Sequence, residues 1–268
     1  MANVAVTGAA GRMGNAVIAA VRDTAQLRLV FALEKSGHTS IGRDAGEVAL
    51  LGAALDVRIT DDIEAAIKGS DVMIDFSVPQ VSMECIEQAA KEGKAIVIGT
   101  TGFSYRQRDR IRELSAKTRV VMAPNMSVGV NLLFKLVHEA AKALSEGYDI
   151  EIVESHHRFK KDAPSGTALR IAEVAAEAVG RDLEKVAVYE RRGIVGERRP
   201  EEIGIQTIRA GDIVGDHTII FAAPGERVEL THKAQSRETF ARGAARAACW
   251  VLDKPSGFYD MQDVLGLK

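Results

Sequence analysis

Residues 3–14 read NVAVTGAAGRMG, an apolar run followed by glycines at positions 8, 11 and 14. The run predicts a strand over Asn3–Thr7, and the alanine-rich Asn15–Arg22 has the apolar spacing of a helix. Glycines between a strand and a helix permit a tight turn and let the backbone approach a pyrophosphate at the helix N-terminus. The G-x-x-G-x-x-G spacing differs from the more familiar G-x-G-x-x-G, and a turn without a ligand is the alternative. The strand and helix that flank the glycines favour a dinucleotide site.

Outward from this turn, strand and helix patterns alternate through the first half of the chain. Further strands are predicted at Leu27–Leu33, Asp71–Phe76, Ala95–Ile98 and Arg119–Met122, and helices at Asp61–Lys68, Gln80–Glu92 and Arg106–Lys117. Apolar strands that alternate with helices indicate a parallel sheet covered on both faces. We therefore expect an α/β protein whose Rossmann-type dinucleotide-binding domain spans residues 1–126.

The pattern changes after Ser127. Asn131–Leu144 predicts one long amphipathic helix with Leu132, Leu133, Leu136, Val137, Ala140 and Leu144 on one side. Tyr148–Ser155 alternates apolar and polar residues, and β-rich segments follow at Ile203–Arg209, Thr218–Ala222 and Val228–Thr231. These features predict a smaller α+β domain with an open mixed sheet over residues 127–235. The alanine-rich Arg237–Leu252 predicts a late helix, and residues 236–268 are expected to complete the first domain.

The composition is that of an ordinary globular protein, with 268 residues, 46% hydrophobic residues and a net charge of −2. That charge gives no global attraction to nucleic acid or to an anionic membrane. The first residues lack the pattern of a signal peptide, and no apolar run approaches the roughly 20 residues of a bilayer span. Two isolated cysteines, Cys85 and Cys249, suggest a reducing compartment, so a cytoplasmic location is expected.

Glu34 and its neighbour bear on the choice of cofactor. Glu34 follows the second predicted strand, twenty residues after Gly14, where a carboxylate can accept hydrogen bonds from the adenosine ribose. Lys35 and Arg12 are cations that could pair with a 2′-phosphate. Because Glu34 favours NADH and the two cations favour NADPH, we predict that both cofactors are used.

Two later loops also follow predicted strands. The first is Gly99-Thr100-Thr101-Gly102, and the second is Ala123-Pro124-Asn125-Met126. Ligands of open α/β sheets bind beyond the carboxyl ends of the strands, so both loops are placed to contact the nicotinamide end of the cofactor. Ordinary turns are the alternative.

The most polar cluster lies at residues 151–168, which read EIVESHHRFKKDAPSGTA. A histidine exchanges protons near neutral pH, and a lysine can donate a proton or neutralise a developing negative charge. The amides of Gly166 and Thr167 open the next predicted helix and form an anion site. This set suits a carboxylate-bearing substrate that accepts hydride at a polarised double bond. A basic surface loop is the alternative, and no His/Cys spacing indicates a metal site.

The same segment resembles the signature of the bacterial dihydrodipicolinate reductase family, also called the 4-hydroxy-tetrahydrodipicolinate reductase family. The resemblance spans the chain and includes the following motifs: GAAGRMG (8–14), DFS (75–77), GTTGF (99–103), NMSVGVN (125–131), RAGDIVGDH (209–217) and THKA (231–234).

The resemblance implies that NADH or NADPH reduces a cyclic dicarboxylate to tetrahydrodipicolinate in lysine and diaminopimelate biosynthesis. It implies a proton donor and acceptor at His156, a proton donor at Lys160, a substrate contact at His157, and a carboxylate site at Gly166 and Thr167. It also implies cofactor contacts at Gly8, Ala9, Ala10, Gly11, Arg12, Met13, Glu34, Lys35, Gly99, Thr100, Thr101, Ala123, Pro124, Asn125 and Met126. A homotetramer centred on the sheets of the second domain is a further implication.

Two other classes of protein share part of this pattern. A reductase of a different imine or amino acid would also need the glycine turn, but it has no need for the whole 151–168 segment. A redox sensor that binds NADPH could keep the glycine turn without His156 and Lys160. Turnover of the expected substrate discriminates among these possibilities.

Overall fold

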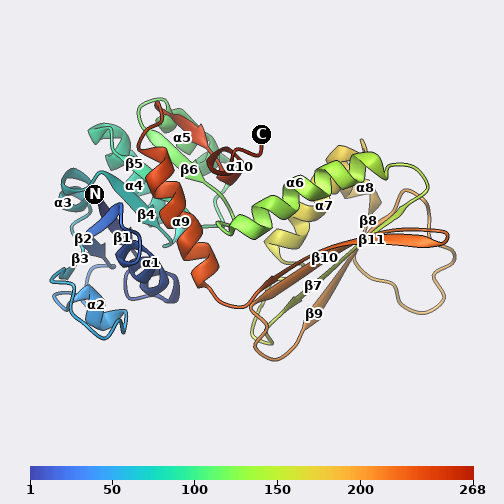
Figure 1. Ribbon diagram of the computed structural model, residues 1–268, viewed down its shortest axis with the longest axis horizontal. Helices are drawn as coiled ribbons and strands as arrows, with labels where there is room; N and C mark the ends of the chain where they lie inside the picture. Colours follow the sequence, from blue (N-terminus) through green and yellow to red (C-terminus); the bar gives the residue numbers. More distant parts are fainter. The chain divides into compact units, whose positions relative to one another are not determined.

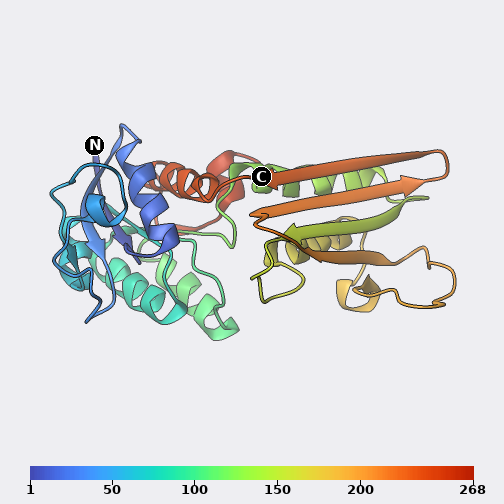
Figure 2. The ribbon, with the colours of Figure 1, turned by 90° about the horizontal axis from the view of Figure 1, so that it is seen from below.

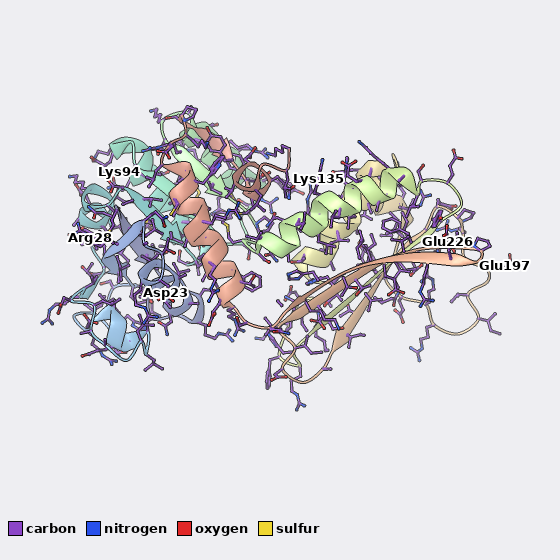
Figure 3. All side chains as sticks on the ribbon, in the orientation of Figure 1. Asp23, Arg28, Lys94, Lys135, Glu197 and Glu226 are labelled. Carbon is purple, nitrogen blue, oxygen red and sulfur yellow. The ribbon has the colours of Figure 1, made fainter.

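The computed structural model describes residues 1–268, which divide into two compact units (Figure 1). The first unit joins Met1–Val128 to Arg237–Lys268, and the second unit is Gly129–Ser236. Charged side chains such as Asp23, Arg28 and Glu226 are exposed and project outward (Figure 3). None of the helices combines the length and the apolar character that a bilayer crossing requires.

The first unit is a seven-stranded parallel sheet in the order β12-β6-β5-β4-β1-β2-β3. The order reverses beside β1, as in doubly wound dinucleotide-binding folds. Its elements are β1 (Ala2–Thr7), α1 (Arg12–Arg22), β2 (Leu27–Leu33), α2 (Ala45–Val48), β3 (Ile59–Thr60), α3 (Ile63–Gly69), β4 (Val72–Asp75), α4 (Pro79–Glu92), β5 (Ala95–Ile98), α5 (Tyr105–Ser115), β6 (Arg119–Met122), α9 (Glu238–Val251), β12 (Gly257–Tyr259) and α10 (Met261–Leu265).

Helices cover both faces of this sheet because successive side chains of a strand point to opposite faces. In β4, Val72 and Ile74 pack in one core with residues of α1, α9 and α10, while Met73 packs in a second core with residues of α3, α4 and α5. All of these strand residues are buried, which explains why the strands are continuously apolar. The late helix α9 is a neighbour of α1 within this unit.

The second unit is a five-stranded mixed sheet in the order β11-β10-β7-β9-β8. Strand β10 is antiparallel to β7 and β11, whereas β7, β9 and β8 are parallel. Helices α6 and α7 lie on one face of the sheet (Figures 1 and 2). The elements are α6 (Val128–Ala143), β7 (Asp149–His156), α7 (Gly166–Ala178), α8 (Leu183–Val186), β8 (Ala187–Val188), β9 (Ile203–Arg209), β10 (Gly215–Ala223) and β11 (Glu226–Ala234).

The predicted apolar side of α6 is partly wrong. Leu132 and Leu136 are 44% and 45% exposed in the chain, although they were assigned to the same side as Leu133 and Val137. The side that packs on the sheet is formed by Val130, Leu133, Phe134, Val137 and Ala141, at the spacing of a helical stripe. The helix is apolar around more than half of its circumference, so composition alone did not fix which stripe is buried.

The predicted fold class is confirmed: a Rossmann-type parallel sheet is followed by a smaller unit with an open mixed sheet. The elements that the sequence did not predict are short. They are α2, β3, α8, β8, β12 and α10, none of which exceeds five residues. Their few residues carry too little periodicity to separate them from loops.

Candidate functional site

A buried glutamate organises the polar cluster of the second unit. Glu154 is fully buried on β7, and its carboxylate accepts 2.9 Å hydrogen bonds from both terminal nitrogens of Arg209. It also accepts hydrogen bonds from His156 Nδ1 at 2.5 Å, from the Ser165 amide at 3.0 Å and from Thr207 Oγ1 at 3.1 Å. The parallel register of β7 and β9 places Thr207 opposite Glu154 and Arg209 opposite His156. The sheet itself therefore brings these groups together.

The groups of this cluster shift the pKa values of one another. Burial opposes ionisation of Glu154, but the hydrogen bonds from Arg209 and His156 outweigh it and lower the pKa of Glu154. Burial also lowers the pKa of His156, although the adjacent Glu154 carboxylate opposes that shift. The preferred state at neutral pH is therefore an ionised Glu154 beside a neutral His156.

The hydrogen bond to Glu154 fixes which nitrogen of His156 is free for chemistry. With Nδ1–H donated to the carboxylate, a neutral imidazole presents its Nε2 lone pair. Gly215 on β10 leaves room for this ring, because a Cβ atom at that position would lie 3.0 Å from His156 Nε2. The ring of His217 packs edge-on against His156, with centroids 5.2 Å apart.

Lys160 lies four residues after His156 and is half-buried, with 21% of its side chain exposed. Its Nζ donates to both oxygens of Asp162, at 2.9 and 2.8 Å. The hydrogen bond from Lys160 lowers the pKa of Asp162. The Asp162 carbonyl in turn accepts a 2.6 Å hydrogen bond from Arg209, so the Glu154 cluster and the Lys160 loop share one arginine.

Helix α7 starts beside this cluster. Ser165 is its N-cap, and Ser165 Oγ accepts a hydrogen bond from the Ala168 amide at 3.1 Å. Gly166 and Thr167 follow in the first turn of the helix, at the positive end of the helix dipole. Gly166 is exposed, so an anion can approach this end of the helix. His157 lies just beyond β7 and is half-buried, and its Nδ1 has no hydrogen-bond partner.

The glycine turn of the first unit has the geometry of a phosphate-binding turn. Gly8 has a φ of 61°, in the left-handed region that favours glycine, and a Cβ atom on Gly14 would lie 2.0 Å from the Gly8 carbonyl oxygen. The Glu34 carboxylate accepts a hydrogen bond from the Ala10 amide at 3.2 Å, which holds the end of β2 against the turn. A cavity of about 480 Å³ is lined by residues that include Gly8, Gly11, Glu34, Lys35 and Ser77.

A second, smaller cavity of about 200 Å³ is lined by Thr100, Thr101, Pro124 and the α5 residues Arg108 and Arg112, among others. The two predicted loops after β5 and β6 therefore meet there. Gly99 is half-buried beside them.

Several predicted contact residues have buried or engaged side chains. Ala9, Ala123 and Met126 belong to the core of the first unit, and Asn125 Oδ1 accepts a hydrogen bond from the Ser127 amide at 2.9 Å. Thr100 is 5% exposed, so any contact it makes with a ligand would be mainly through its backbone. Arg12 and Lys35 are exposed, and Met13 and Ala10 are half-buried.

The Thr100 hydroxyl belongs to a buried cluster around Asp75, the last residue of β4. Asp75 is fully buried and accepts hydrogen bonds from Thr7 Oγ1 at 2.5 Å, Ser77 Oγ at 2.5 Å, Thr100 Oγ1 at 2.9 Å and the Ser82 hydroxyl. Thr100 Oγ1 also accepts a hydrogen bond from the Ser77 amide at 2.9 Å. Asp75 thereby joins the ends of β1, β4 and β5, from which the loops around both cavities start.

Sequence reasoning assigned no role to Asp75, Glu154, Ser165, Arg209 or His217. One available signal was the strand period: Glu154 and His156 are in phase with the buried Ile150 and Ile152. A carboxylate on the buried side of a strand requires polar partners, so this phase identifies a polar cluster. The partners on β9 and β10 were not predictable, because a local sequence pattern does not determine the order and register of the strands.

Comparisons with known proteins agree along the whole chain. The family model described as dihydrodipicolinate reductase, N-terminus, matches residues 2–126, and the model described as dihydrodipicolinate reductase, C-terminus, matches residues 129–265. A relative named 4-hydroxy-tetrahydrodipicolinate reductase, from Syntrophotalea carbinolica, is 54% identical over 268 residues and 100% of both chains. A protein of the same name from Geobacter sulfurreducens is also 54% identical over 100% of both chains.

Solved structures give a similar result. The dipicolinate-bound dihydrodipicolinate reductase from Paenisporosarcina sp. TG-14 is 26% identical, with a TM-score of 0.77 over 98% of each chain. An amine dehydrogenase from Mycobacterium smegmatis, at 14% identity, has a TM-score of 0.57 over 96% of this chain and 94% of its own, which indicates a shared fold alone.

Proposed function

The chain belongs to the dihydrodipicolinate reductase family, and from this premise we propose how its residues divide the reaction. It is an NAD(P)H-dependent 4-hydroxy-tetrahydrodipicolinate reductase of lysine and diaminopimelate biosynthesis. The observation that carries the assignment of roles is the Glu154 cluster, which holds His156 by one nitrogen close to the start of α7.

The first unit fits a nicotinamide dinucleotide. The turn at Gly8–Gly14 is packed so closely that a Cβ atom on Gly14 would lie 2.0 Å from the Gly8 carbonyl oxygen, and Glu34 and Lys35 line the cavity beside it. We propose that Glu34 accepts from the ribose hydroxyls of NADH, and that Lys35 and Arg12 pair with the 2′-phosphate of NADPH. Since the chain offers both kinds of partner, the enzyme uses both cofactors.

When bound, the reduced nicotinamide supplies a hydride to the C=C–C=N system of the substrate. The residues of this chain supply the charge balance and the proton. Negative charge develops toward the ring nitrogen, where the Lys160 ammonium neutralises it and donates a proton. His156 presents a bare Nε2, so it must accept a proton before it can donate one. The Glu154 carboxylate stabilises the imidazolium that results.

The substrate is a dicarboxylate, and α7 supplies the matching site. One carboxylate binds the amides of Gly166 and Thr167 at the positive end of a helix of 13 residues. His157, with an unpartnered Nδ1, is proposed as a further substrate contact. The Asp162 carboxylate and the substrate would both bind the Lys160 ammonium. The hydrogen bonds between Lys160 and Asp162 must therefore break when the substrate binds.

The assignment of Lys160 is tested by turnover with substrate formed in place, from pyruvate and aspartate semialdehyde by the preceding synthase. The wild-type protein should oxidise NADH and NADPH only when the synthase is active. Lys160→Ala should lower kcat by about 10²–10⁴, the range of general acid catalysis, with NADH affinity unchanged. Lys161→Ala is the matched control, since Lys161 is the next residue and is exposed. Near-full turnover by Lys160→Ala would remove the catalytic role.

We also propose a homotetramer that forms through the sheet of the second unit. Helices α6 and α7 cover one face of that sheet, and apolar side chains remain exposed in the isolated chain, among them Ile208 and Val228. Light scattering at assay concentration tests the proposal, and a monomer would contradict it. A cytoplasmic location is proposed as well, supported by two free cysteines.

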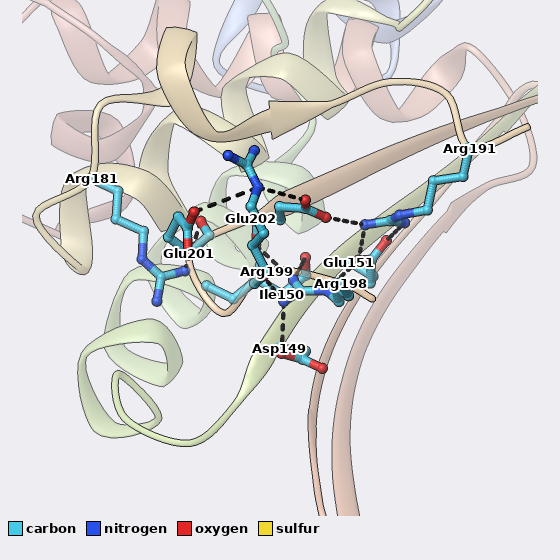
Figure 4. Close-up of polar contacts among 9 residues, drawn as sticks. All are labelled: Asp149, Ile150, Glu151, Arg181, Arg191, Arg198, Arg199, Glu201 and Glu202. Carbon is cyan, nitrogen blue, oxygen red and sulfur yellow. Dashed lines mark hydrogen bonds and ion pairs between the residues drawn. The ribbon is translucent and has the colours of Figure 1, made fainter. Parts of the chain in front are cut away.

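The loop between β8 and β9 is held to β7 by ion pairs (Figure 4). Arg191 donates 2.8 Å hydrogen bonds to both oxygens of Glu151 on β7, and Arg198 donates to Glu151 at 3.0 Å and to Asp149 at 2.7 Å. These ion pairs hold the base of a loop whose tip exposes Ile194 completely. Val195 and Tyr189 of the same segment are also exposed, and a group of exposed apolar side chains indicates a contact with another subunit.

A further inference from the structure

His217 is a buried histidine with no assigned role. It lies on β10 directly opposite Glu154 of β7 and is 4% exposed. Its Nε2 lies 3.0 Å from Ser165 Oγ, while its Nδ1 is buried without a hydrogen-bond partner. An unpartnered buried nitrogen costs about 1–3 kcal/mol, which an apolar residue would avoid. The imidazole is therefore expected to serve through its one hydrogen bond, the contact with Ser165.

Ser165 is held at two points by one pair of neighbouring strands. Its amide donates to Glu154 at 3.0 Å, and its hydroxyl contacts His217 while accepting from the Ala168 amide. Glu154 and His217 are paired residues of the neighbouring strands β7 and β10, and together they fix the position of Ser165, the N-cap of α7. The same Glu154 orients His156 at 2.5 Å. The first turn of α7 and the imidazole of His156 are therefore both held by the Glu154–His217 pair of the sheet.

We propose that His217 is a positioning residue of the reductase, which acts through Ser165 to fix the carboxylate-binding end of α7 relative to His156. The inference rests on the proposed function of Gly166 and Thr167 as the carboxylate site. His217 itself donates no proton to the substrate. Loss of its hydrogen bond loosens the N-cap, so the substrate carboxylate is bound less well while the proton donors remain in place.

The proposal predicts a specific kinetic pattern for His217→Ala and Ser165→Ala. Each should raise KM for the substrate about tenfold, the value of one hydrogen bond of about 1.4 kcal/mol, and lower kcat less than about threefold. His217→Gln retains a group that can bond Ser165 and should restore KM to within about threefold of wild type. His138→Gln on α6, where His138 contacts Glu139 instead, is the matched control.

The double variant His217→Ala/Ser165→Ala separates positioning from simple loss of stability. His217 acts only through the Ser165 hydroxyl, which also caps α7, so the double variant should have nearly the KM of Ser165→Ala alone, whereas independent effects would multiply to about a hundredfold. Multiplied effects, or single variants with wild-type KM, would overturn the proposal. The same holds if His217→Gln fails to restore KM while it folds normally.

Calorimetry with pyridine-2,6-dicarboxylate and NADH gives a second measurement that does not depend on turnover. Weaker binding of the dicarboxylate by His217→Ala, with unchanged NADH binding, supports the positioning role even if the wild-type protein fails to turn over its expected substrate. In that case the proposed reaction fails and the inference stands. A wild-type protein that turns over substrate, paired with a His217→Ala variant of unchanged dicarboxylate affinity, gives the opposite result and overturns the inference alone.

Discussion

Each unit of the chain buries one carboxylate near the carboxyl ends of its strands, but the partners of the two differ. Asp75 in the first unit accepts hydrogen bonds from four hydroxyls, whereas Glu154 in the second unit accepts them from an arginine, a histidine, an amide and a hydroxyl. Hydroxyls tie loops together without changing the charge of the site. A cation and an imidazole couple the carboxylate to protonation.

This difference agrees with the functions that we propose for the two units, cofactor binding in the first and proton transfer in the second. The Asp75 cluster supports the loops around the cavities of the first unit, which we propose as the cofactor site. The Glu154 cluster sets the tautomer of His156 and shares Arg209 with the loop of Lys160. We therefore expect changes at Asp75 to affect cofactor binding and changes at Glu154 to affect the chemical step.

The largest effect is expected for Glu154→Gln. The amide leaves Arg209 without its counter-charge and keeps only one accepting oxygen, so either His156 or the Ser165 amide loses its acceptor and kcat should fall at least about 100-fold. Steady-state kinetics with NADH in excess measures this. The matched control is Glu151→Gln on the other face of β7, which should retain kcat within about threefold. Equal losses in the two variants would contradict the special role of Glu154.

Acid sensitivity of the second unit is the next effect, because His217 adjoins the Glu154 cluster. Burial, with a smaller contribution from His156, lowers the pKa of His217 from 6.5 to about 3. Between these values the unfolded chain binds a proton that the folded chain does not, so stability decreases as the pH falls below 6.5. The expected loss from this group between pH 6.5 and 5 is about 1–2 kcal/mol.

Native-state hydrogen exchange of β7 and β10 amides in this pH range measures that loss. His156 and His232 also have lowered pKa values because of burial, so part of the slope belongs to them. His217→Gln removes one titrating group, so the decrease in stability with falling pH should become less steep by the contribution of one histidine. An unchanged slope in that variant would show that His217 contributes nothing to acid sensitivity.

A smaller effect is expected for Asp75→Asn. The amide nitrogen cannot accept a hydrogen bond, so two of the four hydroxyls lose their acceptor, and the loops that start at Thr7, Ser77 and Thr100 loosen. The Kd for NADH, followed by its fluorescence, should rise about tenfold. Thr7→Val removes one donor only and should raise Kd by a smaller factor. A wild-type Kd in Asp75→Asn would break the link between this cluster and the cofactor.

The smallest effect concerns cofactor choice. Lys35→Ala should raise KM for NADPH about three- to fivefold and leave KM for NADH unchanged, because an exposed ion pair contributes about 1 kcal/mol or less. Glu34→Gln should have the opposite effect on cofactor choice: it should raise KM for NADH more than KM for NADPH. Parallel changes with both cofactors would indicate that neither residue discriminates between them.

The sequence predicted the features that are local and periodic. The glycine turn, the alternation of strands and helices, and the phase of Ile150 and Ile152 all follow from short patterns and are present in the structure. The resemblance to a family added roles for His156 and Lys160, which remain proposals. The buried stripe of α6 was partly wrong, because Leu132 and Leu136 belong to a second apolar stripe of the same helix.

The polar clusters required information that no local pattern holds. Arg209 lies 55 residues after Glu154, and the hydroxyl of Thr100 lies 25 residues after Asp75. Each pair meets only because neighbouring strands adopt one order and one register. Charges in phase with buried residues signal that partners must exist, but they do not identify them.

The division of labour between Asp75 and Glu154 is tested most directly by measuring both variants in the same two assays. NADH binding is titrated by fluorescence, and the hydride step is followed in a single turnover at saturating NADH. The account predicts that Asp75→Asn weakens NADH binding about tenfold with a single-turnover rate within about threefold of wild type. Glu154→Gln should bind NADH normally and lose at least about 100-fold in the single-turnover rate. Normal NADH binding by Asp75→Asn, or a near-normal hydride step in Glu154→Gln, would contradict it.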